Sequence, residues 1–329
     1  MANDDVALAT AQPSLAESAA AHQPRAVNPL SQVRAAVRAM RPRQWTKNGI
    51  VFLALVFSVN QEYQISEPDQ WVPRVLEALV AFLAFCLVSS ADYLVNDIRD
   101  VESDRAHPKK RRRPIAAGEL SVNAAWTWSA VLAAAGIAIA FALDWRVGVV
   151  VLAYAMLMVA YSYSLKHMVL VDLMVIAAGF VLRAMAGALA IDVPISPWLY
   201  VVTALGALFL GINKRRAELD LLQDGAGNHR KILDDYTPEL LDQMLSTVTA
   251  ATLMAYGLYT FTADGLPENH TMMLTIPFVL YGIFRYLYLV NVKKEGGSPE
   301  DVLLKDVPIM LTLIGWIVTA GVILLIARD

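Results

Sequence analysis

Long apolar runs separated by short polar loops make up this sequence from about residue 48 to its end. Most runs approach the roughly 20 residues that an α-helix needs to cross a bilayer, although the first is short. We therefore predict about nine membrane-spanning helices and an all-α membrane protein. The predicted spans are residues 48–60, 73–95, 122–143, 147–165, 173–191, 197–213, 241–262, 271–291 and 306–327.

The composition agrees with this pattern. Of the 329 residues, 57% are hydrophobic and 17% are charged, and the mean hydropathy is +0.48. A soluble domain averages about 45–50% apolar and about 25% charged residues, so we exclude that class. The single cysteine, Cys86, lies inside an apolar run, and the five histidines are scattered. Neither a disulfide framework nor a zinc site is therefore expected.

The N-terminal segment is polar and lacks an apolar run. Residues 1–30 are rich in Ala, Ser, Asn, Gln and Pro, which predicts a disordered cytosolic tail rather than a secretory signal. Residues 31–47 are predicted to form a juxtamembrane amphipathic helix, followed by a transmembrane domain over 48–329. Around this helix, the apolar positions are Leu30, Val33, Val37 and Met40, and the basic positions are Arg34, Arg38 and Arg41.

Lysine and arginine are distributed unevenly between the two sides of the predicted membrane. They crowd before the first span and in the loops 96–121 and 214–240, whereas the opposite side carries only Arg74, Arg146 and Arg328. By the positive-inside rule, the N-terminus and the basic loops lie in the cytosol. Every loop with candidate chemistry then faces the same side.

The stretch from Asp92 to Pro114 joins a row of carboxylates to a basic run, directly after the second predicted span. At about 100° per residue, one helical arc of about 100° holds Asn96, Asp97, Asp100 and Asp104, with Asp92 beside it. Clustered carboxylates repel one another, and hard oxygen ligands suit Mg²⁺. We therefore predict that these four residues, Asn96 to Asp104, are the metal ligands and catalytic residues. The alternative, a solvated acidic turn before a positive-inside anchor, leaves the acidic cluster unexplained.

Basic side chains near this cluster are candidates for binding phosphate. The run after the acidic face supplies Lys109, Lys110 and Arg113. A second loop supplies Lys214, Arg215, Arg216 and Glu218. Lys214 and Glu218 share a helical face, and an ordinary salt bridge at a helix end is the alternative for them. Further candidates are Lys47, Tyr161 and Lys166, although Lys166 could equally be a topology marker.

Arg183 lies near the middle of the fifth predicted span. A charge at that depth costs roughly 2.5–3.5 kcal/mol on insertion scales, so the side chain should face the interior of the bundle and pair with an anion. The candidate anions are a ligand phosphate and the carboxylate of Asp172, three turns earlier on the same helix.

The pattern Asn96-Asp97-x-x-Asp100-x-x-x-Asp104, followed by Arg113-Pro114-Ile115-x-x-Gly118, resembles the UbiA superfamily of intramembrane prenyltransferases. The resemblance implies a helical bundle around a central cavity open to the cytosolic side. It also implies a diphosphate substrate held through Mg²⁺ by two Asp-rich loops. The second loop departs from the family pattern, because Lys214-x-x-x-Glu218 stands where two aspartates are usual; Asp220 and Asp224 leave a shifted register open.

Other motifs are similar to one branch of that superfamily, the decaprenyl-phosphate phosphoribosyltransferases. These motifs are Arg41-Pro-Arg-Gln-Trp-Thr-Lys-Asn48, Leu165-Lys166-His167 and Asn213-Lys-Arg-Arg-Ala-Glu218-Leu219. That resemblance implies transfer of 5-phosphoribosyl from 5-phosphoribosyl-1-diphosphate to decaprenyl phosphate, with release of diphosphate. The enzyme would lie in a bacterial plasma membrane, and its product would feed the arabinan of the cell wall.

Two other functions stay open at this stage. An ordinary prenyltransferase would use an isoprenyl diphosphate donor and an aromatic acceptor. A membrane transporter or lipid-phosphate binding protein would use the basic loops for anion capture without turnover, although we find no pair of broken helices in matching halves. We expect contacts with membrane lipids and no nucleic-acid partner, and the sequence leaves homo-oligomerisation open.

Overall fold

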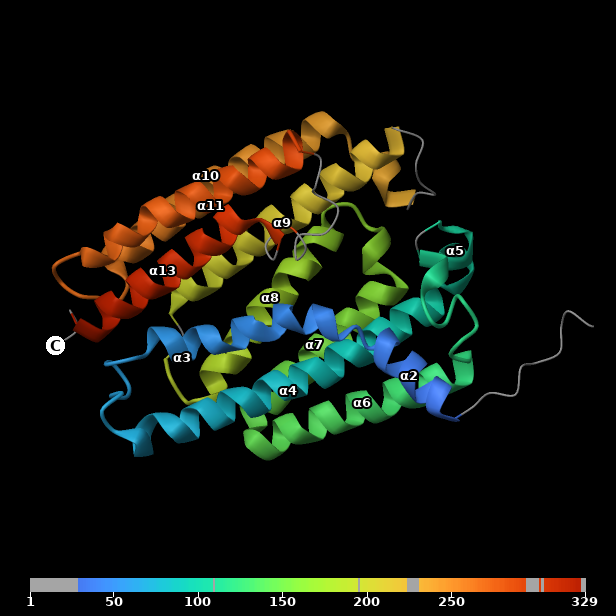
Figure 1. Ribbon diagram of the computed structural model, residues 1–329, viewed down its shortest axis with the longest axis horizontal. Helices are drawn as coiled ribbons and strands as arrows, with labels where there is room; N and C mark the ends of the chain where they lie inside the picture. The colour runs from blue at the N-terminus through green and yellow to red at the C-terminus, as the bar shows by residue number, and fades with distance from the viewer. Residues whose placement is uncertain are drawn as a thin grey trace, which may run out of the picture.

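A computed structural model describes residues 29–108, 110–194, 196–223, 231–293, 302 and 305–326 (Figure 1). Its α-helices are α2 (Pro29–Ala39), α3 (Leu53–Phe57), α4 (Pro68–Arg99), α5 (Val101–Ala106), α6 (Val122–Leu143), α7 (Trp145–Tyr163), α8 (Val171–Ala190), α9 (Pro197–Gln223), α10 (Pro238–Thr262), α11 (Ile276–Asn291) and α13 (Val307–Ile326). Its 3₁₀ segments are η1 (Pro42–Phe52), η2 (Lys110–Arg112), η3 (Leu165–His167), η4 (Lys231–Asp235) and η5 (Thr271–Thr275). Apart from one isolated bridge, Val59 to Tyr63, the described residues contain no β-structure. The predicted all-α class is confirmed.

The long helices run side by side along the longest axis of the molecule (Figure 1). Helix α4 packs against α6, α7, α8 and η1, while α9 lies between α8 and α10, and α11 packs on α13. One apolar core, around Phe85 and Val151, joins α4 to α7 and α8. A second core, around Ile212 and Leu241, joins α8 to the last four helices. The bundle therefore has two packed halves that share α8.

Glycines allow close approach between elements of the first half. A Cβ added to Gly136 of α6 would lie 2.8 Å from the carbonyl oxygen of Ala84 in α4. A Cβ on Gly187 of α8 would collide with the carbonyl oxygen of Val51 in η1. In a membrane the hydrophobic effect does not bring helices together, so close van der Waals packing through small residues stabilises such crossings.

The count of about nine membrane spans is not confirmed. Among the described residues, seven helices are long and apolar enough to cross a membrane. The first predicted span, 48–60, falls on the end of η1 and the five-residue helix α3, which rises only about 8 Å. The predicted span 241–262 lies in α10, which is long but carries Glu239, Asp242, one serine and five threonines. The chain is a multi-pass integral membrane protein.

The predicted amphipathic helix ends earlier than expected. Helix α2 stops at Ala39, and the chain turns at Arg41, whose φ is 54°, into η1. Ala35, Ala36 and Ala39 are buried beside α4 and α6, whereas Val33 and Val37 remain exposed. The turn at Arg41 directs the chain into the end of the bundle where α4 meets α5. We call this the polar end.

Candidate active site

The end of α4 and the short helix α5 build the predicted acidic face. Helix α4 ends at Arg99 and α5 begins at Val101, and the amide of Asp104 donates to the carbonyl of Asp100 at 2.8 Å. The chain thus keeps an almost continuous helical course through the motif. The carboxylates of Asp97 and Asp104 are each 2% exposed. Two negative charges are therefore buried at the polar end, and they need counter-ions.

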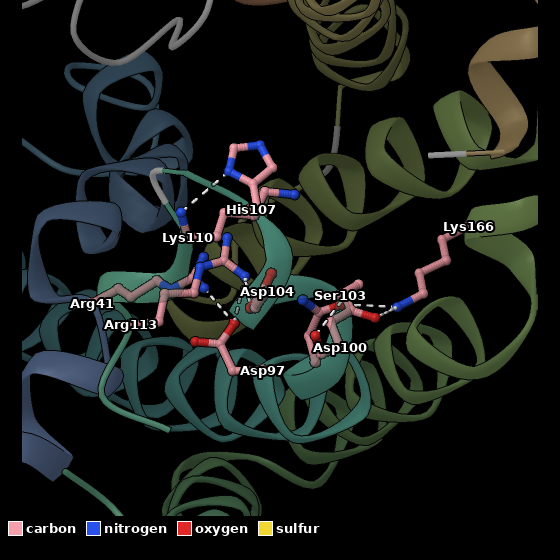
Figure 2. A network of polar contacts seen from close by, with 10 residues as sticks. Arg41, Asp97, Asp100, Ser103, Asp104, His107, Lys110, Arg113 and Lys166 are labelled. Carbon is pink, nitrogen blue, oxygen red and sulfur yellow. Dashed lines mark hydrogen bonds and ion pairs between the residues drawn. The ribbon is translucent and has the colours of Figure 1, made fainter. Parts of the chain in front are cut away.

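Two arginines supply those counter-ions, as Figure 2 shows. Arg41 Nη2 lies 2.5 Å from Asp97 Oδ1. Arg113 Nη1 lies 3.1 Å from the same oxygen and 2.6 Å from Asp104 Oδ2. Burial raises the pKa of the Asp104 carboxyl, and the positive charge of Arg113 opposes that shift. Arg113 therefore joins the carboxylates of α4 and α5 through one guanidinium.

Lys166 reaches the same face from another part of the chain (Figure 2). It lies in η3, between α7 and α8, and it is only 5% exposed. Its Nζ lies 2.6 Å from Asp100 Oδ1 and donates to Asn96 Oδ1 at 3.4 Å. A buried lysine in contact with the motif is not a topology marker at the membrane surface. We call the set Asn96, Asp97, Asp100, Asp104, Arg41, Arg113 and Lys166 the acidic–basic cluster.

The four predicted metal ligands lie in two adjacent pairs. Asp97 and Asp104 share Arg113, whereas Asn96 and Asp100 share Lys166. In the part of the chain that the structure describes, no three His, Cys, Asp or Glu side chains are grouped so that they could hold a metal. Asp97 Oδ2, however, is buried and has no hydrogen-bond partner. An unsatisfied carboxylate oxygen among hard oxygen donors fits a divalent cation chemically, and the ligand set stays a prediction.

The other lysines predicted to bind substrate are spread around this end of the bundle. Lys110 lies in η2, its amide donates to His107 Nδ1 at 3.2 Å, and its charge acts on Asp104. Lys47 lies in η1, and Lys214 lies in α9. Lys109 is outside the described residues. The structure therefore brings Lys110 and Lys166 to the acidic face and leaves the roles of Lys47 and Lys214 as predictions.

Arg215 lies in a buried network rather than at an open surface. It is 2% exposed; its Nε lies 2.8 Å from Asp172 Oδ2, and its Nη1 lies 2.6 Å from Glu218 Oε2. Its Nη2 donates to the hydroxyl of Tyr161 at 3.5 Å. Asp172 also accepts from the Tyr236 hydroxyl at 2.8 Å. Arg215 thus ties α8, α9 and the end of α7 together, and Glu218 pairs with Arg215 at i,i+3.

Two further residues belong to this region. Tyr236 is 3% exposed, and burial raises the pKa of its hydroxyl. Arg216 pairs with Asp220 and, at 3.0 Å, with Asp242 of α10. Of the two aspartates in the shifted register, Asp220 is therefore paired with an arginine. Asp224 lies outside the described residues.

Arg183 faces the interior of the bundle, as predicted, but not toward Asp172. Its Nε donates to Asn48 Oδ1 at 2.7 Å, its Nη2 to the Tyr154 hydroxyl at 2.7 Å, and its Nη1 to the Gly179 carbonyl at 2.8 Å. The predicted pairing with Asp172 is wrong, because the two residues are about 16 Å apart along α8. Phe180, Tyr154 and Phe85 surround the guanidinium.

An apolar cavity of about 450 Å³ lies away from the acidic–basic cluster. It is bounded by η1, α3 and the adjoining turn, by α9, and by α10 and α13; its lining includes Phe57, Phe180, Trp198, Gly206 and Trp316. Residues where α9 begins and α10 ends border it, so it lies toward the end of the bundle opposite the polar end.

Sequence reasoning overlooked several polar residues that the structure brings into these networks. Arg41 was assigned to an amphipathic helix and Asn48 to the edge of a span, yet both contact buried charges. Their signal was the dense polar sequence immediately before the first apolar run. Nothing in the sequence indicated that Tyr236 contacts Asp172, because 64 residues separate them.

These features define a class: an all-helical, multi-pass membrane protein with buried carboxylates and basic side chains at one end of its bundle. A family model described as the UbiA prenyltransferase family matches residues 68–304. The chain belongs to that family.

Curated relatives and solved structures agree with this assignment. The chain is 36% identical to the decaprenyl-phosphate phosphoribosyltransferase of Mycolicibacterium smegmatis, over 91% of this chain and 95% of the relative. It is also 36% identical to the enzyme of that name from Corynebacterium glutamicum, over 85% and 84%. A UbiA homologue from Archaeoglobus fulgidus, solved with GPP and Mg²⁺, has a TM-score of 0.66 at 18% identity, covering 88% of this chain and 99% of the homologue. The UbiA-like fold is therefore established.

Proposed function

We propose that this protein transfers the 5-phosphoribosyl group from 5-phosphoribosyl-1-diphosphate to decaprenyl phosphate and releases diphosphate. The observation that carries the proposal is the acidic–basic cluster, in which buried carboxylates lie in contact with Arg41, Arg113 and Lys166. A donor with two phosphate groups and an acceptor with a third need many cationic partners. The similarity to phosphoribosyltransferases over most of the chain supports the choice of donor.

Mg²⁺ would be held by Asp97, through its unpartnered Oδ2, together with Asn96, Asp100 and Asp104. When bound, it supplies positive charge that stabilises a leaving diphosphate. Arg113, Lys110 and Lys166 hold the phosphate oxygens beside it. Lys47 and Lys214 bind the 5-phosphate or the lipid phosphate.

The remaining work of the site is to position two anions. The acceptor phosphate is already ionised at neutral pH, so no general base is needed to remove a proton from the attacking oxygen. The anomeric carbon gains positive charge as its bond to diphosphate breaks. Cationic side chains screen the repulsion between donor and acceptor and orient the two reacting atoms. The polyprenyl tail lies in the apolar cavity lined by Phe180 and Trp316.

We further propose that the polar end faces the cytosol of a bacterial plasma membrane, where a soluble sugar phosphate is available. The membrane-embedded cavity then receives the lipid substrate from the bilayer. The product supplies an arabinose donor for the cell wall. The ordinary prenyltransferase alternative is less favoured, because Lys214-x-x-x-Glu218 stands where its second metal-binding motif has two aspartates.

The test is transfer of radiolabel from 5-phosphoribosyl-1-diphosphate into a lipid phase, using purified protein in nanodiscs with polyprenyl phosphate and Mg²⁺. Asp97→Asn and Lys166→Met should each lower transfer by about 100-fold or more, because each removes a charged group from the cluster. Asp69→Asn, an exposed position at the other end of α4, is the matched control and should keep wild-type activity.

Two outcomes would overturn the proposal. Consumption of an isoprenyl diphosphate with an aromatic acceptor, without transfer of label from the sugar donor, would establish the ordinary prenyltransferase. Movement of polyprenyl phosphate between leaflets without release of diphosphate would establish a transporter.

A further inference from the structure

Asp92 lies on α4 one helical turn before Asn96, deeper in the bundle than the acidic–basic cluster. Its Oδ2 atom is buried and has no hydrogen-bond partner. An orphaned acceptor of this kind costs free energy in the folded state unless something outside the protein satisfies it. Because residues four apart on a helix share a face, Asp92 and Asn96 point to the same side of α4.

Other carboxylates at the polar end have partners of their own. Asp100 accepts from Lys166, Asp104 from Arg113, and Asp172 from Arg215 and Tyr236. Among the residues that the structure describes, the buried carboxylate oxygens without a partner are Asp92 Oδ2 and Asp97 Oδ2. Helix α4 therefore offers two unused acceptors, five residues apart along the chain.

The surroundings of Asp92 place it between the cluster and the interior of the bundle. Arg183 and Tyr154 both lie within electrostatic range of its carboxylate. Arg183 donates hydrogen bonds to Asn48, to Tyr154 and to the Gly179 carbonyl, and not to Asp92. Because Arg183 makes no direct contact with Asp92, the carboxyl group of Asp92 stays available to a ligand.

We infer that Asp92 is a specificity-determining residue, whose carboxylate accepts hydrogen bonds from the ribose hydroxyls of the donor substrate. This inference rests on the proposed function. The phosphate groups of the donor need cations, and lysine and arginine have no acceptor atoms to offer a hydroxyl. A sugar held at its phosphates by the cluster brings its hydroxyl groups toward the next turn of α4. An isoprenyl chain has no hydroxyl groups and would leave Asp92 buried and unsatisfied, which selects against it.

The experiment measures steady-state transfer by nanodisc-embedded protein at saturating polyprenyl phosphate while the concentration of 5-phosphoribosyl-1-diphosphate is varied. In Asp92→Ala the KM for the sugar donor should rise by about 10-fold, the value of one buried hydrogen bond. Asp92→Asn, which keeps an acceptor oxygen, should recover part of that loss. The KM for polyprenyl phosphate and the inhibition constant of inorganic diphosphate should stay at wild-type values.

A donor analogue without the ribose 2-hydroxyl or the 3-hydroxyl sharpens the test. Wild type should discriminate against at least one analogue, and Asp92→Ala should lose that discrimination. The matched control is Asp69→Ala, an exposed aspartate on the same helix. If wild type transfers the sugar but Asp92→Ala keeps both its donor KM and its discrimination, the inference is wrong. If wild type transfers no phosphoribosyl group, the proposed function itself has failed.

Discussion

The pair formed by Asp172 and Arg215 should be among the most sensitive positions for stability. Asp172 is fully buried and Arg215 is 2% exposed, with Arg215 Nε 2.8 Å from Asp172 Oδ2. Asp172→Asn leaves a buried guanidinium without its carboxylate, which typically costs about 3–5 kcal/mol. Glu218 remains paired with Arg215 and is 27% exposed, so we expect the lower end, about 3 kcal/mol.

Reversible unfolding in mixed micelles, followed by far-UV circular dichroism, measures this loss. The double variant Asp172→Asn with Arg215→Met removes both charges. It should regain most of the stability that each single variant loses relative to wild type. The cycle should therefore give a coupling energy above about 3 kcal/mol, because each single variant leaves one buried charge without its partner. Additive losses, or a loss below about 1 kcal/mol in Asp172→Asn, would refute the reasoning that this buried pair is a structural tie.

The same double variant decides between two roles for Arg215. If its guanidinium only positions neighbouring elements, the stabilised double variant should keep a donor KM within about threefold of wild type. If Arg215 binds a substrate phosphate, as its sequence context predicts, the donor KM should rise by tenfold or more even though the fold is restored.

Three further predictions follow from other parts of the bundle. Gly187→Val should destabilise the protein by about 3 kcal/mol or more in the same unfolding assay, because its side chain would collide with the Val51 carbonyl. Gly206→Leu should fold normally, since a Cβ there meets nothing within 4 Å, yet raise the KM for polyprenyl phosphate several-fold by filling the apolar cavity. Hydrogen bonds from Arg285 lower the pKa of Asp306, so the wild type should lose stability as the pH falls below the ordinary aspartate value of 3.8. Asp306→Asn should lack that acid-dependent loss, and a pH series of melting temperatures checks it.

Local sequence determined the helices and the acidic face. Apolar runs of bilayer length mark most of the long helices, and the spacing of Asn96, Asp97, Asp100 and Asp104 put them on one side of α4 and α5. Both inferences rest on the helical repeat, which depends only on neighbours along the chain. The short η1 and α3 were harder to recognise, because the close approach of Val51 to Gly187 of α8 is a tertiary contact that no local pattern in the sequence marks.

Only the tertiary structure decided which charge meets which partner. Lys166 and Arg41 contact the carboxylates of α4 although 66 and 56 residues separate the pairs, and Arg215 contacts Asp172 across two helices. Sequence alone suggested Arg183 as the partner of Asp172, but both lie on one rigid helix too far apart to touch. Ion pairing depends on distances of a few ångströms between helices, and those distances are set by how side chains pack across the bundle rather than by their order in the chain.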